Sequence, residues 1–336
     1  MKAVRYHQTG TPDVLRLEDV PKPTPGPGEV VVAVRAAALN RLDLFLRGGL
    51  AVMPGFKMPH IGGFDVAGDV AAVGADVKGD LVGKPVVLKA RVTGPEARGK
   101  LDIIGISRPG GFAEFVLAPA SALVPKPDGW SYEQAAAFPC CHLTAYYGLV
   151  LRAAVRPGET VLVHAGGSGA GAAAVQVARL AGASVITTVG RDTSVAKARE
   201  LLGADRVINY RAEDVVKSVQ EFTRGRGVDV VFDPIWGASA AQTVECLGPG
   251  GRWIVLGMVG GQSAEIVAAR IMFKELAIRG IVEFYATDDE FMAAMNLAYQ
   301  DRLRPIVDRV WPLERLADAQ RQMESGEFFG KIVVRP

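Results

Sequence analysis

Short apolar runs separated by glycine fill the first third of the chain. The clearest of these runs lie at 30–34, 66–74, 85–88 and 112–116. Many short strands joined by glycine turns are typical of barrel-like β domains. Residues 1–125 are therefore predicted to form a β-rich domain. Within it, residues 93–110 are rich in Gly and charge, which favours a surface loop.

After Pro127 the pattern changes to one in which strands and helices alternate. Strands are predicted at 160–163, 184–189, 206–209, 228–232, 253–256 and 276–281. Helices are predicted between them at 172–180, 193–202, 213–223 and 238–247. Repeated β-α units require parallel strands, and right-handed crossovers then produce a doubly wound sheet. A helix at 290–300 and a strand at 331–334 complete the chain.

Composition limits the classes of protein to consider. The 336 residues are 49% hydrophobic and 22% charged, with a net charge of +2, which is ordinary for a globular protein of two domains. So small a charge gives no electrostatic reason to expect nucleic acid or a membrane surface as partner. No apolar run approaches the ~20 residues that span a bilayer, and the start lacks an apolar signal core. A cytoplasmic location is expected. Three cysteines are too few for a four-cysteine zinc site, and a disulfide framework is implausible.

A glycine-rich loop follows the first strand of the alternating region and opens a helix. Its residues are Gly166, Gly167, Ser168, Gly169, Ala170 and Gly171. A strand, a glycine loop and a helix in this order present backbone N–H groups and a helix N-terminus to a pyrophosphate. The alternative is a tight turn that binds nothing. The run of β-α units that the loop opens favours a dinucleotide site.

The end of the second strand bears on the choice of dinucleotide. An acidic residue there would bind the ribose 2′-hydroxyl of NAD. This chain has Gly190 and Arg191 instead, and Asp192 comes late. An arginine can meet a 2′-phosphate with two hydrogen bonds, so NADP(H) is predicted over NAD(H). The alternative for Arg191 is a solvated surface charge.

In combination with the glycine loop, several further stretches resemble the medium-chain dehydrogenase/reductase superfamily over essentially the whole chain. They lie at 25–30, 36–43, 63–74, 110–116 and 329–333. The resemblance implies an α/β protein with a GroES-like catalytic domain (1–125 and 281–336) and a Rossmann domain (126–280). The chain looks most like the zinc-independent quinone oxidoreductase group, although parts of it also look like zinc-type alcohol dehydrogenases.

The resemblance also bears on metal binding. Zinc-type members have a cysteine where this chain has Asn40, and a His-Glu pair where it has Phe64 and Asp65. Their third ligand falls near Cys140, which is present. A catalytic zinc needs about three protein ligands, so no metal is expected. His60, four residues before Phe64, is the one candidate for a replacement ligand.

The same resemblance assigns provisional roles to individual residues. It implies that Asn40 and Thr144 lie beside the nicotinamide, Tyr210 near the adenosine phosphate and Lys331 near the cofactor cleft. Their alternatives are a loop-capping amide, helix packing, a strand-end aromatic and a surface lysine. Arg47 is a candidate partner for a substrate anion or carbonyl.

Taken together, these features predict an NADPH-dependent, zinc-independent oxidoreductase that passes hydride to a quinone or an α,β-unsaturated carbonyl. An electron-poor acceptor spreads the added charge over its own π system, so it needs little help from a Lewis acid. The alternatives are a zinc-type alcohol dehydrogenase or ketone reductase, and an NADPH-binding structural or sensor protein. Relatives often pair through the edge strand of the Rossmann sheet, here 276–281, so a homodimer is also expected.

Overall fold

The computed structural model describes the chain except for residues 51–54 and 94–100. It divides into two compact units, whose ranges follow. The first comprises Met1–Pro139, Phe284–Met295 and Ile306–Pro336, and the second comprises Cys140–Glu283 and Asn296–Pro305. The first unit thus extends beyond the expected boundary at 125. The reason is helix α2 (Tyr132–Ala137), whose buried alanines pack with Ala36, Ala38 and Ala67 of the first unit's sheet.

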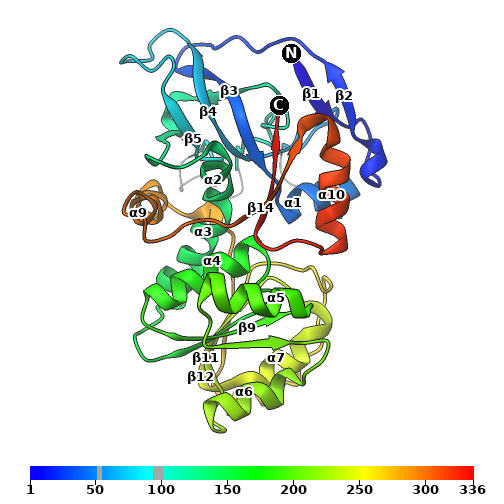
Figure 1. Cartoon of the computed structure of the whole chain (residues 1–336), viewed down its shortest axis with the longest axis vertical. Coiled ribbons are helices and arrows are strands. Elements are labelled where there is room, and N and C mark those ends of the chain that lie inside the picture. Colours follow the sequence, from blue (N-terminus) through cyan, green and yellow to red (C-terminus); the bar gives the residue numbers. More distant parts are fainter. Residues whose placement is uncertain (51–54, 94–100) are drawn as a thin grey trace. The chain divides into compact units, whose positions relative to one another are not determined.

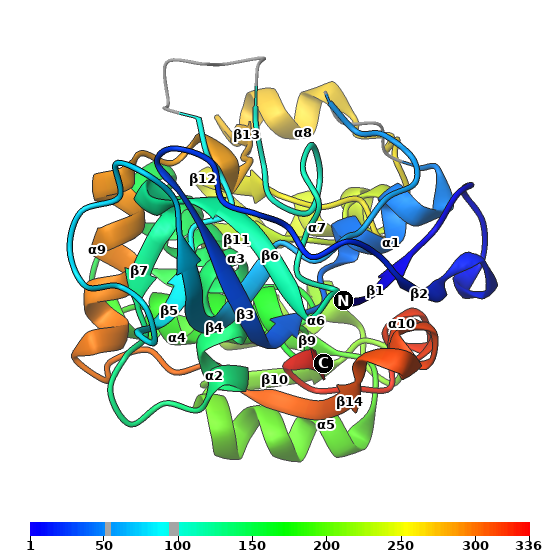
Figure 2. The ribbon, with the colours of Figure 1, turned by 90° about the horizontal axis from the view of Figure 1, so that it is seen from above.

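The first unit is rich in β-strands, as predicted, and its strand pairs are antiparallel except for β14 and β15, which are parallel. The strands are β1 (Lys2–Arg5), β2 (Arg16–Asp19), β3 (Glu29–Ala38), β4 (Asp65–Val73), β5 (Pro85–Leu88), β6 (Phe115–Pro119), β7 (Leu123–Pro125), β14 (Val307–Pro312) and β15 (Lys331–Arg335). Strands β1 and β2 pair alone, and the larger sheet has the order β14-β15-β3-β4-β5-β7 with β6 on β3. Strands β3, β4 and β5 run side by side in Figure 2. The helices of this unit besides α2 are α1 (Arg41–Gly48), most of α9 (Asp288–Tyr299) and α10 (Leu316–Ser325).

The interpretation of residues 93–110 as a surface loop is wrong for the part that the structure describes beyond residue 100. Ile103 and Ile104 are fully buried, and the N–H of Ile104 donates to the carbonyl of Ala90 at 2.9 Å. Ile104 belongs to the core of the first unit. The charged residues and glycines around these isoleucines made the whole segment look exposed, although the two apolar side chains are buried. Residues 94–100 of the predicted loop lie outside the described residues.

The second unit contains the predicted doubly wound sheet. Its strands are β8 (Thr160–Val163), β9 (Ser184–Val189), β10 (Arg206–Asn209), β11 (Val228–Asp233), β12 (Leu247–Val255) and β13 (Ala277–Gly280). All are parallel, in the order β10-β9-β8-β11-β12-β13. Its helices are α3 (Pro139–Tyr146), α4 (Gly169–Leu180), α5 (Asp192–Lys197), α6 (Val215–Thr223), α7 (Ala240–Cys246) and α8 (Ala268–Phe273). Helices α4 and α5 cover one face of the sheet, and α6 and α7 cover the other (Figure 1).

The strand order places the site. Strands β9 and β10 are added on one side of β8, and the chain then returns to add β11 and the later strands on the other side. Strands β8 and β11 are therefore neighbours at the point where the strand order changes side. In open α/β sheets, ligands bind outside the carboxyl ends of the strands at such a point. The glycine loop leaves the carboxyl end of β8 and therefore lies there.

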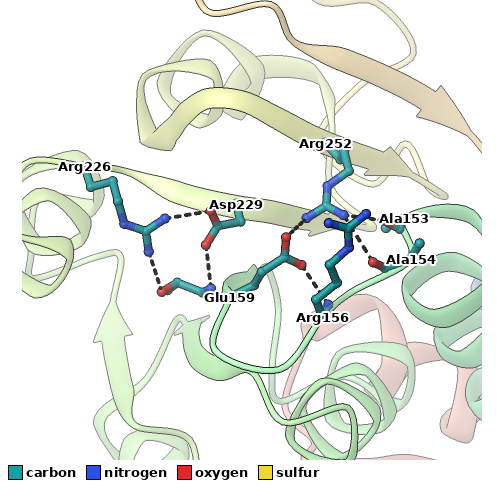
Figure 3. Close-up of polar contacts among 8 residues, drawn as sticks. Ala153, Ala154, Arg156, Glu159, Arg226, Asp229 and Arg252 are labelled. Carbon is teal, nitrogen blue, oxygen red and sulfur yellow. Dashed lines mark hydrogen bonds and ion pairs between the residues drawn. The ribbon is translucent and has the colours of Figure 1, made fainter.

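A polar network closes the opposite end of the same strands (Figure 3). Asp229, on β11, accepts from the Arg226 guanidinium at 2.6 Å. Glu159, just before β8, accepts from Arg252 of β12 at 2.6 Å, and Arg252 also donates to the carbonyl of Ala153. These charges are paired at the amino ends of the strands and contribute to holding the sheet together, away from the site at the carboxyl ends.

Within the described residues, no helix is both long enough and apolar enough to cross a membrane.

Candidate functional site

The glycine loop is held in place from beneath by a buried histidine. The ring of His164 lies 3.2 Å from the Thr188 hydroxyl and 3.0 Å from the Thr243 hydroxyl. The same Thr188 hydroxyl accepts from the N–H of Ala165, which has a left-handed backbone with φ of 55°. Burial lowers the pKa of His164, which favours the neutral ring. The start of the loop is therefore fixed by hydrogen bonds that involve Thr188 and a neutral His164 ring.

Two glycines in the loop are required by close backbone approach. A Cβ at Gly171 would lie 2.1 Å from the carbonyl oxygen of Ala165, and one at Gly166 would lie 2.1 Å from the hydroxyl of Thr187. Neither position has room for a side chain. The loop can thus turn tightly and place α4 directly behind it.

Ser168 is the N-cap of α4 and occupies the middle glycine position of the dinucleotide motif. Its hydroxyl accepts from the N–H of Gly171 at 3.0 Å. The first N–H groups of a helix have no partner within the helix. Since Ser168 takes that of Gly171, the N–H groups of Gly169 and Ala170 remain at the positive end of the helix dipole, where a phosphate would bind.

The second strand end brings together three of the predicted cofactor residues. Gly190 and Arg191 follow β9, and Tyr210 follows the neighbouring strand β10. A Cβ at Gly190 would lie 2.7 Å from the hydroxyl of Tyr210, so this aromatic side chain lies against the glycine backbone. Arg191 is the N-cap of α5. The structure thus brings Gly190, Arg191 and Tyr210 together at the ends of two neighbouring strands.

The sequence reading missed Asp233, the last residue of β11. Its carboxylate is fully buried and accepts from the N–H groups of Ile235 and Trp236 at 2.7 and 3.0 Å. It also accepts from the indole of Trp253 at 3.0 Å. Trp236 has a left-handed φ of 55°, a strained value for a bulky residue. An aspartate directly before a proline at the end of an apolar run was the one available signal. Asp233 fixes the start of the loop that follows β11, at the carboxyl end of the strand next to β8.

In the first unit, Asn40 and Lys331 form a buried cluster with Asp65. The Lys331 ammonium donates to Asn40 Oδ1 at 2.7 Å and to Asp65 Oδ2 at 3.0 Å. Asn40 Nδ2 donates to the same Asp65 oxygen at 2.9 Å. The side chains of Lys331 and Asp65 are only 4% and 1% exposed. Lys331 is therefore not a surface lysine, and the Asn40 amide is oriented by a buried charge pair.

Asp43 ties this cluster to the start of α1. Its carboxylate accepts from the N–H groups of Asn40 at 2.8 Å and Gly63 at 3.1 Å. Burial raises the pKa of Asp43 to about 7, against the opposing effect of these hydrogen bonds and of Lys331. Asp43 thus caps the helix and holds the residue whose side chain meets Lys331.

Two predicted residues remain, Arg47 in the first unit and Thr144 in the second. Arg47 is at the other end of α1 from Asn40, is 4% exposed and is ion-paired with Glu324 of α10. That pairing gives Arg47 a structural partner within the first unit. Thr144 is buried in α3 of the second unit. The structure gives no contact that assigns either residue to a substrate.

The side chains at the positions of the zinc ligands do not fit zinc. The oxygen atoms of Asn40 and Asp65 accept hydrogen bonds from the Lys331 ammonium. A metal ion bound to the same oxygens would be repelled by the positive charge of Lys331. Phe64 has no donor atom. The Cys140 thiol donates to Glu283 at 3.4 Å, and the ring Nε2 of His60 lies 3.0 Å from the carbonyl of Gly105. The described residues contain no group of three or more His, Cys, Asp or Glu side chains arranged to hold a metal ion.

Comparison with known proteins places these features in a family. Residues 26–128 match the alcohol dehydrogenase GroES-like domain, and residues 169–299 match the zinc-binding dehydrogenase domain. Quinone oxidoreductase of Lama guanicoe is 30% identical, over 99% of this chain and 97% of that protein.

Two solved structures extend the comparison over the whole chain. One, an NAD-dependent alcohol dehydrogenase, is 36% identical with a TM-score of 0.93, covering 100% of both chains. The quinone oxidoreductase of Escherichia coli in complex with NADPH is 28% identical with a TM-score of 0.87, again over 100% of both chains. The predicted combination of a GroES-like domain with a Rossmann-type sheet is confirmed. The chain is an oxidoreductase that belongs to the medium-chain dehydrogenase/reductase superfamily, and within it is quinone-oxidoreductase-like.

Proposed function

We propose that this protein is an NADPH-dependent, zinc-independent reductase of quinones or α,β-unsaturated carbonyls. The observation that carries the proposal is the buried ammonium of Lys331 between Asn40 and Asp65. It places a fixed cation at the positions of the zinc ligands of zinc-type relatives. An acceptor that is already electron-poor suits such a site better than a simple ketone, which needs strong polarisation.

The second unit supplies the dinucleotide site in this proposal. The N–H groups of Gly169 and Ala170 bind the pyrophosphate at the start of α4. Arg191 binds the 2′-phosphate, with Tyr210 beside it. The two structural neighbours differ in the cofactor that their names give, NAD in one and NADPH in the other. The preference for NADPH therefore rests on Arg191 and on the lack of a carboxylate at the end of β9.

In this proposal the polar group that acts on the hydride acceptor belongs to the first unit. When bound, a reduced nicotinamide supplies a hydride. Asn40, fixed by Lys331 and Asp65, presents an oriented amide, and an oriented polar group costs little reorganisation when charge develops on an acceptor. Thr144 is assigned beside the nicotinamide by resemblance alone.

The direct test is NADPH oxidation by chelator-treated protein, followed by absorbance, with a quinone, an enone and an aldehyde in parallel. The series is repeated with NADH. We expect turnover of the quinone or the enone without metal, and lower KM for NADPH than for NADH. Aldehyde turnover that returns only with added zinc would overturn the proposal.

The 36% identity to an NAD-dependent alcohol dehydrogenase favours alcohol or ketone chemistry as the second candidate. The same assay separates the two, because alcohol oxidation with NAD and no activity on quinones would support the second. Tight NADPH binding without turnover of any acceptor would indicate a structural or sensor role.

We also propose that the protein is a homodimer joined through β13. All four residues of this edge strand are exposed, and α8 before it has no buried residue. Phe273 is 86% exposed and Met272 is 70% exposed, beside an edge whose outer hydrogen-bonding groups have no strand partner among the described residues. An open edge with apolar side chains suits pairing with a second copy of itself.

A further inference from the structure

The ends of β9 and β10 lie side by side at the edge of the second unit's sheet. The strands are parallel, and Val189 is aligned with Asn209. The residues that follow β9, including Asp192, therefore leave the sheet next to those that follow β10. Across this boundary the Asn209 amide Nδ2 donates to Asp192 Oδ1 at 2.7 Å.

Asn209 is fixed by two further hydrogen bonds. Its side-chain oxygen accepts from the N–H of Arg211 at 3.1 Å, and its own N–H donates to Glu213 at 3.0 Å. Glu213 is in turn ion-paired with Arg206. Because its oxygen accepts from a backbone N–H, the amide must present its NH₂ group to Asp192. Asn209 is only 7% exposed, whereas Asp192 is exposed, so a buried amide holds a carboxylate at the surface.

The neighbouring residue, Tyr210, contacts the end of β9 just before Arg191. Its N–H donates to the carbonyl of Val189 at 3.0 Å, and its side chain lies against Gly190. Asn209 and Tyr210 thus contact the residues on either side of Arg191 in the sequence. Tyr210 covers the residue before it, and Asn209 holds the carboxylate of the residue after it.

We propose that Asn209 determines cofactor specificity by holding the Asp192 carboxylate toward β10, away from a 2′-phosphate on Arg191. This inference rests on the proposed preference for NADPH. A 2′-phosphate carries close to two negative charges and is repelled by a nearby carboxylate. The ribose 2′-hydroxyl of NADH, in contrast, is a good donor to a carboxylate. Releasing Asp192 thus weakens NADPH binding and leaves NADH binding unchanged or stronger.

The test compares Asn209→Ala, Asp192→Asn and the double variant with the wild type. The dissociation constants for NADPH and NADH are measured by protein fluorescence or calorimetry, without any acceptor. We expect Asn209→Ala to lower the NADPH preference, taken as the ratio of the two constants, by about ten-fold. The double variant should return within about three-fold of the wild-type ratio, because the carboxylate charge is gone. Asn296→Ala, at an exposed position of α9, is the matched control.

The outcomes separate this inference from the function on which it rests. A loss of affinity for both cofactors, equal in the single and double variants, would mean that Asn209 is merely structural and would overturn the inference. An unchanged ratio in Asn209→Ala would do so as well. A wild type with no NADPH preference would overturn the proposed cofactor. In that case, a ratio that falls in Asn209→Ala and recovers in the double variant would still support the role of Asn209.

Discussion

The Nζ atom of Lys331 lies 3.0 Å from Oδ2 of Asp65, and both side chains are almost completely buried in the first unit. Residues 65 and 331 begin two strands, β4 and β15, each of which pairs with β3. The same ammonium donates to Asn40, just after the end of β3. Removing one partner of a charge pair at this depth is strongly destabilising, because the other charge stays buried without its counter-charge.

Replacing Lys331 by Met should therefore destabilise the protein by about 3–5 kcal/mol, because the buried Asp65 carboxylate loses the ammonium that faces it. The double variant Lys331→Met/Asp65→Asn should regain at least about 1 kcal/mol of that loss. Urea denaturation of the single and double variants measures both effects. Lys217→Met is the control, since its pair with Glu221 is exposed and should matter by less than about 1 kcal/mol. Equal stability of Lys331→Met and Lys217→Met would contradict the assignment.

Asp43 should make stability fall as the pH rises. Burial raises its pKa from 3.8 to about 7 in the folded protein, so the folded state holds a proton that the unfolded state has released. Its contribution is complete below pH 3.8 and is lost as the pH rises through about 7. Burial lowers the pKa of His60 to about 4, which acts in the opposite direction over part of this range.

The difference in stability between wild type and Asp43→Asn isolates the carboxyl group from His60. This difference should shift against the wild type between pH 5 and pH 8, by about 1.4 kcal/mol for each unit of pKa difference that the range spans. Thermal or urea unfolding at several pH values measures it. A difference that is constant with pH would show that Asp43 does not titrate in this range.

Replacing Arg191 by Ala tests the cofactor preference directly. Loss of a charge-assisted contact to the 2′-phosphate should raise the dissociation constant for NADPH by about 10- to 100-fold. NADH has no such phosphate, and its affinity should change by less than about two-fold. Arg199→Ala, at an exposed position shortly after α5, removes the same charge outside the proposed contact. If both arginine variants weaken NADPH equally, the effect is one of net charge alone.

Gly171→Ala should weaken dinucleotide binding without replacing any side chain of the site. The new methyl group would lie 2.1 Å from the backbone oxygen of Ala165, so the loop and α4 must move apart. Affinity for either cofactor should fall by at least about ten-fold, measured by fluorescence titration. Gly48→Ala in α1, where nothing lies within 4 Å of the added Cβ, should bind as the wild type does.

The proposed dimer makes Phe273 a sensitive position. Phe273→Asp places a charge in the apolar surface beside β13 and should convert the dimer to a monomer, as measured by sedimentation velocity. Val310→Asp, on the first unit's strand β14 and 40% exposed, should leave the assembly unchanged. A wild type that sediments as a monomer at all concentrations would refute the proposal.

The sequence by itself determined how strands and helices alternate along the chain in the second unit, and where the glycine loop lies. Both follow from local periodicity and from the spacing of glycines. The resemblance to zinc-type dehydrogenases also implied, from residue types alone, that two of their three zinc ligands are replaced in this chain. The structure adds the reason for two of these glycines, because a Cβ at Gly171 would meet the backbone of Ala165 and one at Gly190 would meet the Tyr210 side chain.

Only the tertiary structure decided which distant side chains meet. Lys331 reaches Asn40 across 291 positions because β15 is placed beside β3, and strand order is not encoded in the periodicity of either strand. The Asn209–Asp192 contact depends in the same way on the register of β10 against β9. The polar residues around Ile103 and Ile104 gave no sign in the sequence that these two side chains are buried. Nor could the sequence show that Arg47 is ion-paired with Glu324 of α10. Local pattern fixes which face of an element is apolar, whereas the packing of the elements fixes which polar groups are buried together.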